Sequence, residues 1–206
     1  MTSLPPFPAI KSISRRWLAA LAAGVALAAA SPAVLAAWDL QQLMDSLAQN
    51  KSGRATFVET KRIALLDRPV ESSGELVFTA PDRLEKRTLK PRPESMIVAG
   101  GELVVERGSR RMRVQLQSQP QLAAFIESIR GTLAGDRAAL ERSYRLSLEG
   151  SPDNWALLLV PLDEKMQAVI RQIKISGTAD RVRIVDIAQA DGDSSTMVIE
   201  KAAAPQ

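Results

Sequence analysis

The stretch RMRVQLQ, residues 111–117, indicates the fold class, because apolar and polar side chains alternate along it without a break. Met112, Val114 and Leu116 fall on one side of an extended chain, and arginines and glutamines fall on the other. This pattern is typical of a β-strand with one apolar face and one solvent-exposed face. The same period of two recurs in three other stretches, residues 73–79, 102–107 and 145–149.

Short turn-forming segments rich in Gly, Pro, Asp, Asn and Ser separate these stretches. They lie at residues 80–82, 99–101, 108–109, 150–154, 176–178 and 191–193. Strands and turns that alternate every 8–12 residues or so favour an antiparallel meander, closed or half-closed into a barrel. About ten strands fit between residues 54 and 201.

Two parts of the chain have a helical period instead. Residues 38–50 carry one apolar stripe, which predicts a short amphipathic helix before the sheet. Residues 121–143 predict a pair of helices inserted in mid-sheet, with residues 131–135 as the interruption and Asp136 as the cap of the second helix. Three helices are therefore available to cover one opening of the curved sheet.

Residues 1–36 have the composition of a secretory signal peptide. Basic residues precede an Ala- and Leu-rich stretch, and the segment contains no acidic residue. Small side chains at the expected positions predict cleavage before Ala37, which leaves residues 37–206 as a single domain. The alternative is an uncleaved membrane anchor, but the apolar stretch is short for a span of about 20 residues. We expect a periplasmic protein.

Charge and composition exclude several classes of function. The 27 Lys and Arg residues exceed the 23 Asp and Glu residues, but much of the excess lies in residues 1–36. No nucleic-acid partner is expected, because such binders carry a strong local excess of basic residues. The chain has no His and no Cys, which excludes thiolate metal sites and His-dependent nucleophilic catalysis. We expect no enzyme and no cofactor.

Five carboxylates on the polar faces of the expected strands are interpreted as solvated partners of nearby Arg and Lys side chains. They are Glu59, Glu75, Glu85, Glu102 and Glu106.

Aromatic residues make up only 4% of the chain, so the core lacks the large side chains that usually fill a barrel. Either the helices fill the interior or it holds a hydrophobic ligand. Burying an acyl chain there would contribute about 0.8 kcal/mol for each CH₂ group. The pattern of residues is equally consistent with a ligand cavity and with an ordinary packed core.

The order of several short motifs resembles the LolA-type outer-membrane lipoprotein carrier family over most of residues 38–201. An N-terminal helix is followed by ATFVE at residues 55–59, similar to the family's first strand. GELVFTAP at residues 74–81 is similar to a hairpin of that family. PESMIVAGG at residues 93–101, the inserted helices and WALLLVP at residues 155–161 follow in the expected order.

The resemblance implies a mostly β protein with helices (α+β), built as a half-open antiparallel β-barrel covered by a helical lid. Members of the family carry acylated lipoproteins across the periplasm. The resemblance therefore implies an acylated lipoprotein or lipid as cargo, an inner-membrane transporter or exporter as donor, and an outer-membrane acceptor. We expect the carrier itself to be a monomer.

The chain departs from the family pattern at the lid. The family has an arginine just before the hairpin proline, which latches the lid to helix backbone, and here that position is Ala80. Arg83 and Arg87 share a parity with Glu85, so neither is expected to replace the latch. The aromatic pair expected after the proline is also missing. These departures suggest a divergent branch with a free lipid or a polyene as a possible cargo.

We expect acyl chains to bind, without covalent chemistry, in a cavity between the sheet and the lid. The strand residues expected to line it are Phe57, Leu76, Phe78, Leu103, Val105, Met112, Val114, Leu116, Leu146, Leu148, Trp155 and Leu157. The expected lid residues are Leu122, Phe125, Ile126 and Ile129.

Three other functions stay open. One is a periplasmic sensor or accessory protein of a lipid or polyene export system, which binds acyl groups without transporting lipoproteins. Such sensors usually carry a second domain, and about 170 residues leave little room for one. The second is an enzyme of acyl or lipid metabolism, against which the lack of His and Cys argues. The third is a structural envelope protein that holds no ligand.

Overall fold

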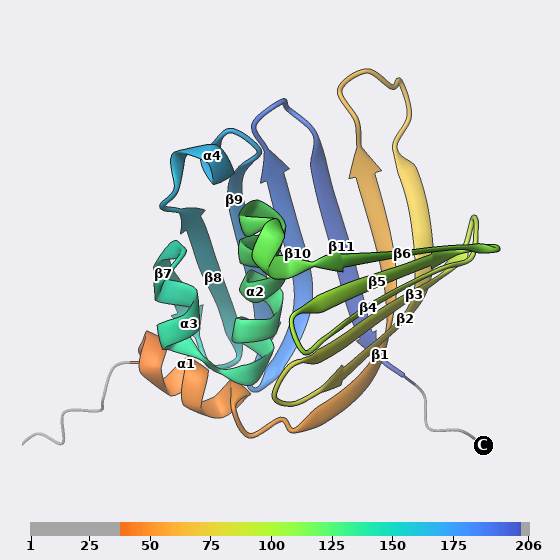
Figure 1. Cartoon of the computed structure of the whole chain (residues 1–206). Coiled ribbons are helices and arrows are strands. Elements are labelled where there is room, and N and C mark those ends of the chain that lie inside the picture. Colours follow the sequence, from red (N-terminus) through yellow and green to blue (C-terminus); the bar gives the residue numbers. More distant parts are fainter. Residues whose placement is uncertain (1–37, 203–206) are drawn as a thin grey trace, which may run out of the picture. The chain divides into compact units, whose positions relative to one another are not determined.

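The computed structural model describes residues 38–202, which form an open, bent sheet of 11 antiparallel strands with three helices on its concave face (Figure 1). The strands are β1 (Ser52–Arg62), β2 (Val70–Thr79), β3 (Arg83–Lys90), β4 (Glu94–Ala99), β5 (Glu102–Arg107), β6 (Arg110–Gln115), β7 (Tyr144–Ser151), β8 (Asn154–Pro161), β9 (Ile170–Thr178), β10 (Arg181–Gln189) and β11 (Ser194–Lys201). The helices are α1 (Leu40–Leu47), α2 (Pro120–Ala134), α3 (Arg137–Glu141) and α4 (Glu164–Gln167), and a 3₁₀ turn, η1, spans Leu116–Ser118.

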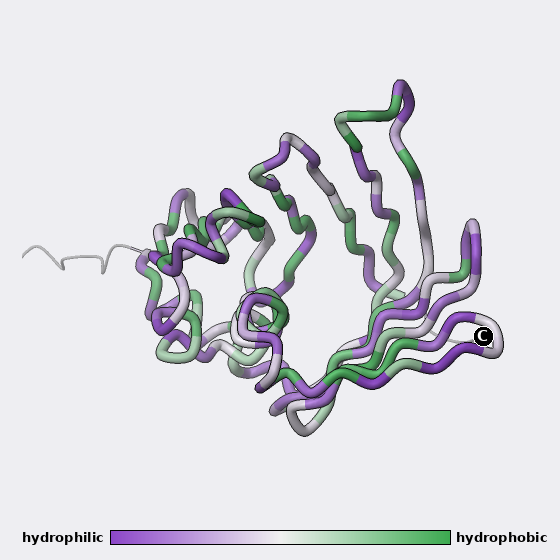
Figure 2. The backbone as a smooth tube through the Cα atoms, turned by 45° about the horizontal axis from the view of Figure 1, so that its top comes forward, coloured by the Kyte–Doolittle hydropathy of each residue, from purple (hydrophilic) through white to green (hydrophobic). Residues whose placement is uncertain are grey.

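The sheet consists of two meanders joined in the middle. Its strand order is β6-β5-β4-β3-β2-β1-β11-β10-β9-β8-β7, so the first strand pairs with the last. In that central ladder Phe57 lies opposite Ile199. Figure 2 shows hydrophobic and hydrophilic residues alternating along the strands of the sheet. The expected mostly β architecture, a half-open antiparallel barrel covered by helices, is confirmed.

The register follows from the alternation in the sequence. Leu103 lies opposite Val114 and Val105 lies opposite Met112, so the apolar residues of β5 and β6 share the helix-facing side. A slip of one residue would turn that whole set to the other face. The turn between β4 and β5 uses Gly100 and Gly101, which have positive φ angles of 56° and 81°. That backbone conformation favours glycine.

The helices begin and end where the sequence supplies caps. In α1, Asp39 accepts a hydrogen bond from the Gln42 amide at 2.9 Å, and the Gln42 side chain accepts one from the Asp39 amide at 3.1 Å. This reciprocal pair is a capping box. Asp136 caps α3, as expected, by accepting from the Ala139 amide at 2.9 Å.

Three local predictions are wrong. Residues 131–135 do not interrupt α2, which runs through Gly131 and ends at Gly135, whose φ is 66°. Leu116 lies in η1 and not in a strand, although it is buried as expected. The turn expected at residues 176–178 comes later, because β9 continues to Thr178.

The signal peptide and the cleavage before Ala37 concern residues outside those described. Within residues 38–202, no helix is both long and apolar enough to cross a membrane.

Candidate functional site

Two apolar clusters lie on the concave face of the sheet. The α1 cluster has as its buried members Leu43, Met44, Leu47, Leu140, Tyr144, Trp155, Leu157, Leu159, Met166, Ile170, Ile173, Ile175 and Val185. The α2 cluster joins buried Val98, Leu103, Leu116 and Ile126 with partly buried Leu84, Met96, Val105, Val114, Leu122, Ala123 and Phe125. The first belongs to the β7–β11 meander with α1 and α3, and the second lies between β3–β6 and α2.

The predicted cavity residues divide between the two clusters. The α2 cluster contains Leu103, Val105, Val114, Leu116, Leu122, Phe125 and Ile126. The α1 cluster contains or contacts Ile129, Leu146, Leu148, Trp155 and Leu157. Phe125 contacts both clusters, so α2 lies between the apolar faces of the two meanders.

Four predicted residues lie outside both clusters. Phe57 and Phe78 are buried on the helix-facing side, and Leu76 is half-buried there, directly opposite Lys86. Met112 is 56% exposed, because it lies on β6, an edge strand with a single neighbour. The role of all these residues in acyl binding stays a prediction.

The α1 cluster is a filled core. Trp155 and Leu157 have no exposed surface, and the Trp155 indole donates a hydrogen bond to the Ala179 carbonyl at 2.9 Å. Gly177 gives the indole its space, since a Cβ there would lie 2.4 Å from Trp155 Cζ2. The α2 cluster differs, because most of its apolar side chains are only partly buried. The incompletely covered apolar surface of the concave face therefore lies on the α2 side.

The backbone of helix α2 lies farther from the strands than from the neighbouring helices. Among the described elements its closest backbone neighbours are α1, α3 and η1, and no strand approaches it to the same extent. Tyr144, at the start of β7, links the two layers by donating a hydrogen bond to the Ala124 carbonyl of α2 at 3.0 Å. Burial raises the pKa of Tyr144 to about 12, against a smaller lowering by its hydrogen bond with Ser128.

Glu59 is a buried carboxylate on the helix-facing side of β1. It is 5% exposed, so the expectation that it is solvated is wrong. It accepts hydrogen bonds from Lys86 at 2.5 Å, Ser195 at 2.8 Å and Ser72 at 3.4 Å, and Lys61 Nζ lies 3.5 Å away. Burial alone would raise the pKa of Glu59, but the Lys86 hydrogen bond and charge, with Ser195 and Lys61, lower it overall.

Glu85 is also buried, at 4% exposure, and so also contradicts the expectation of a solvated carboxylate. It lies on the outer face of the sheet, where Arg87 bonds it and Arg83 lies 3.1 Å away. Both arginines are thus held on the face away from the helices, and neither replaces the latch missing at Ala80. No sequence signal marked Tyr144 or the burial of Glu59.

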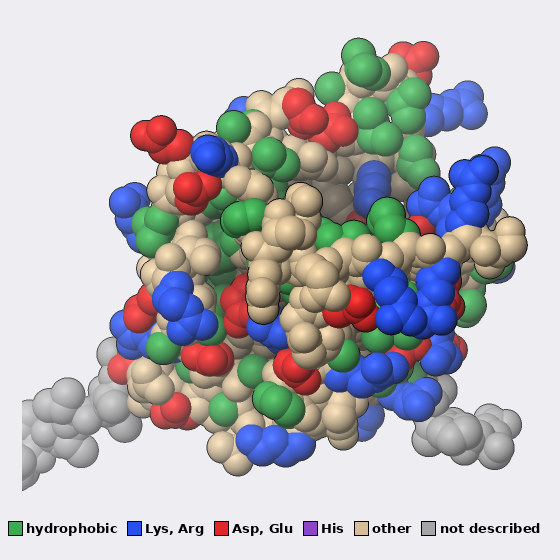
Figure 3. Space-filling view, in the orientation of Figure 1, with side chains coloured by type: hydrophobic (Ala, Val, Ile, Leu, Met, Phe, Trp, Pro, Cys, Tyr) green, Lys and Arg blue, Asp and Glu red, His purple; other side chains and the backbone are tan. Residues whose placement is uncertain are grey.

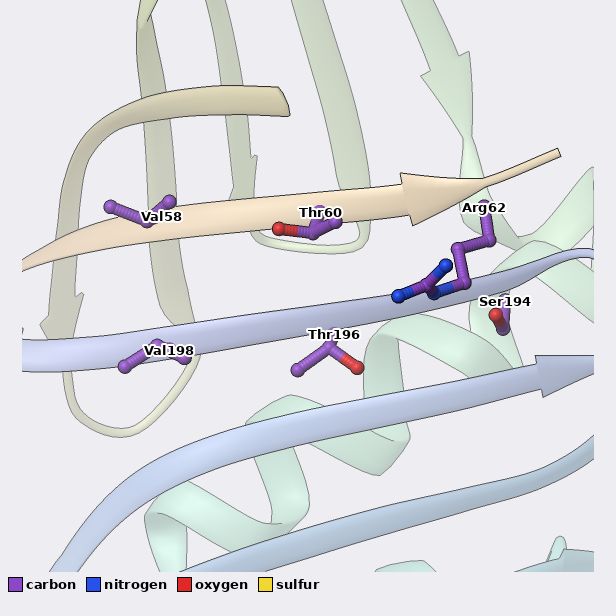
Figure 4. Close-up of a pocket in the computed structure, with 6 residues that line it drawn as sticks. All are labelled: Val58, Thr60, Arg62, Ser194, Thr196 and Val198. Carbon is purple, nitrogen blue, oxygen red and sulfur yellow. The ribbon is translucent and has the colours of Figure 1, made fainter. Parts of the chain in front are cut away.

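A pocket of about 290 Å³ opens on the outer face of the sheet between β1 and β11. Figure 4 shows its lining, which comprises Val58, Thr60, Arg62, Ser194, Thr196 and Val198. These residues have the opposite parity to Phe57 and Glu59, so the pocket is separate from the concave face. Its lining combines three hydroxyl groups and one guanidinium with two valines, whereas sites for apolar ligands are lined predominantly by hydrophobic side chains.

Within residues 38–202, no group of three or more carboxylates is arranged to hold a metal ion. The concave face instead carries the partly buried apolar surface of the α2 cluster. It also carries a charged cluster, which consists of Glu59, Lys61 and Lys86. This arrangement suits non-covalent binding of a molecule with an apolar and a polar part.

A sequence model of the family described as outer membrane lipoprotein carrier protein LolA-like matches residues 28–205. No curated protein matches the chain. Among solved structures, a LolA superfamily protein from Nitrosomonas europaea is 13% identical, with a TM-score of 0.44 over 82% of this chain and 96% of that one.

Two further structures are similar to the described fold. MucB in the Pseudomonas aeruginosa MucA/MucB complex is 14% identical, with a TM-score of 0.46 over 82% of this chain and 59% of that one. LprF from Mycobacterium bovis is 11% identical, with a TM-score of 0.33 over 81% of this chain and 94% of that one.

Proposed function

Because the chain belongs to the LolA-like family of outer membrane lipoprotein carrier proteins, we propose that it is a periplasmic carrier of acyl chains. It binds the acyl groups of lipoproteins or lipids beneath α2, without covalent chemistry, and ferries them from the inner to the outer membrane. An inner-membrane transporter or exporter supplies the cargo, and an outer-membrane acceptor receives it.

The partly buried surface of the α2 cluster is the observation that carries this proposal. A row of apolar side chains crosses β3, β4, β5 and β6, since Leu84 pairs with Val98, Val98 with Leu103, and Leu103 with Val114. The neighbouring members Met96, Val105, Leu122 and Phe125 keep part of their surface exposed. An acyl chain laid along this row would cover that surface, at about 25 cal/mol for each Å² removed from water.

The energies are sufficient for a reversible carrier. A chain of twelve or so carbons gains on the order of 10 kcal/mol from burial, before the cost of ordering the chain and the protein. Helix α2 contacts the strands through side chains and takes no part in their backbone pairing. It can therefore shift without breaking the hydrogen bonds between strands. Cargo can then enter and leave while the sheet stays intact.

Replacing Phe125 by Glu tests the proposal. Phe125 bridges both clusters, and a charge there opposes an acyl chain because an unpaired charge is costly in an apolar site. We expect the variant to lose at least about tenfold in affinity for a fluorescent fatty acid while its circular dichroism stays unchanged.

Leu65→Glu is the matched control, because Leu65 is 94% exposed in the β1–β2 loop. This variant should bind the fatty acid as tightly as the wild type does. Unchanged binding by Phe125→Glu would contradict a site beneath α2. Native mass spectrometry of protein purified from its own periplasm should also reveal a bound lipid or acylated cargo.

A further inference from the structure

The concave face changes character along the strands of the first meander. At one end its helix-facing residues are apolar, as with Phe57 on β1 and Leu84 on β3. Towards the other end they become polar, with Glu59 and Lys61 on β1 and Thr88 on β3. The same register places three more charged side chains on this side, with Glu94 opposite Thr88 and Arg107 opposite Arg110, and Arg107 pairs with Glu94. The face is therefore apolar at one end and charged at the other.

The charged end carries an excess of positive charge. Lys61 and Lys86 both approach the single carboxylate of Glu59, at 3.5 Å and 2.5 Å. One carboxylate neutralises one of the two ammonium groups, so the cluster holds a net charge of about +1. Figure 3 shows a hollow between α2 and the central strands with a basic side chain inside it.

Among the described residues, the two ammonium groups also have more hydrogen-bond donors than acceptors. Each lysine ammonium carries three donors. Within the described residues, Lys86 donates to one acceptor, Glu59, although its side chain is only 23% exposed. Lys61 is 51% exposed and lies beyond normal hydrogen-bond distance from Glu59. An anionic oxygen placed between the two ammonium groups would accept from both.

This charged cluster adjoins the expected path of the acyl chain. Lys86 lies directly opposite Leu76 on one side and Met96 on the other, and its ammonium is 4.9 Å from the centre of the Phe57 ring. Its aliphatic stem thus runs over apolar surface while its charge reaches the polar end.

We propose that Lys86 and Lys61 bind the anionic head group, a carboxylate or a phosphate, of an amphiphile whose acyl chain lies beneath α2. The inference rests on the proposed function and adds to it the chemical class of the ligand's polar end. Neutral amphiphiles with the same chain bind more weakly, because they leave the spare ammonium donors without an anionic partner.

The test compares dodecanoate with 1-monododecanoylglycerol, which share a chain and differ in head-group charge. Affinities are measured by displacement of the neutral dye N-phenyl-1-naphthylamine. The wild type should bind dodecanoate at least about tenfold more tightly than the glyceride. Lys86→Met and Lys61→Met should each reduce that preference to about threefold or less, because they weaken dodecanoate binding more than glyceride binding.

Two variants guard against a folding artefact. Lys61→Met keeps the Glu59–Lys86 bond, so it remains informative if Lys86→Met leaves Glu59 unpaired and unfolds. Lys174→Met makes the same change at an exposed position on the outer face, opposite Asp186, and should retain the wild-type preference.

The outcomes separate the two proposals. Equal wild-type affinities, or a preference that survives both lysine substitutions, would overturn the head-group site and leave the carrier proposal standing. If neither amphiphile binds, the carrier proposal itself fails. Inorganic phosphate that binds as tightly as dodecanoate would assign the cluster to a free anion and overturn the inference, whereas no phosphate binding at millimolar concentration supports it.

Discussion

At the scale of single residues, Tyr144 shows how one side chain can tie α2 to the sheet. It is the only tyrosine of the chain, it is almost fully buried, and its hydroxyl group donates to a carbonyl in the middle of α2. A hydrogen bond of this kind contributes about 1 kcal/mol. A contribution of this size helps to hold α2 against the sheet, and under the proposed function it is small enough to be broken when cargo enters.

The ionisation of Tyr144 gives the first prediction. Burial raises its pKa from 10.0 to about 12, so the folded state favours the neutral phenol. Its contribution to stability is complete below pH 10 and is lost as the pH rises through 12. Absorbance of tyrosinate near 295 nm should therefore titrate near pH 12 in the folded protein and near pH 10 in denaturant.

The Tyr144→Phe variant is the control, because it has no tyrosinate signal and should lack this alkaline loss of stability. A wild-type midpoint near pH 10, with circular dichroism still native, would mean that Tyr144 is open to solvent.

At the scale of elements, the junction between α2 and α3 depends on one glycine. Gly135 ends α2 with a φ of 66°, and its amide donates to the Thr132 carbonyl at 3.1 Å. A Cβ at this position would lie 2.1 Å from the Met44 carbonyl oxygen, which is backbone and cannot move aside easily. The close approach of α2 to α1 therefore requires glycine here.

Replacing Gly135 by Ala should lower the free energy of unfolding by at least about 2 kcal/mol, since strain and a backbone clash act together. Urea unfolding followed by circular dichroism measures this loss. Gly53→Ala is the matched control, because a Cβ at Gly53 meets nothing within 4 Å and should change stability by less than about 0.5 kcal/mol. Equal effects of the two substitutions would contradict the packing described.

At the scale of the whole molecule, the alternation of residues 111–117 and its repeats predicted the sheet, its turns and its apolar face. Periodicity also predicted α1, α2 and α3, but not the short helix α4. Periodicity could not predict that α2 lies between two apolar clusters. A helix that packs against one cluster and a helix that packs against two have the same apolar stripe, here the one that contains Phe125 and Ile129. Glu59 was expected on a polar strand face but lies on the same side as Phe57, and its burial depends on Lys86 and Ser195, which are distant in sequence.

The central ladder gives the last prediction. Strand β11 joins the two meanders, so proline at Ile199 should remove backbone pairing from the middle of the sheet and lower the free energy of unfolding by about 3 kcal/mol or more. Ile199→Ala separates the loss of the side chain from the loss of the backbone bonds, and should cost less. Urea unfolding measures both, and equal losses would mean that the ladder is not needed.

The pairing of β1 with β11 also sets the order in which the protein can mature. Residues 194–201 are synthesised long after residues 52–62, yet they supply that strand with its second neighbour. Until they arrive, β1 has β2 on one side and an open edge on the other. The sheet therefore stays incomplete until β11 has been made, and until then the free edge of β1 is open to pairing with another strand.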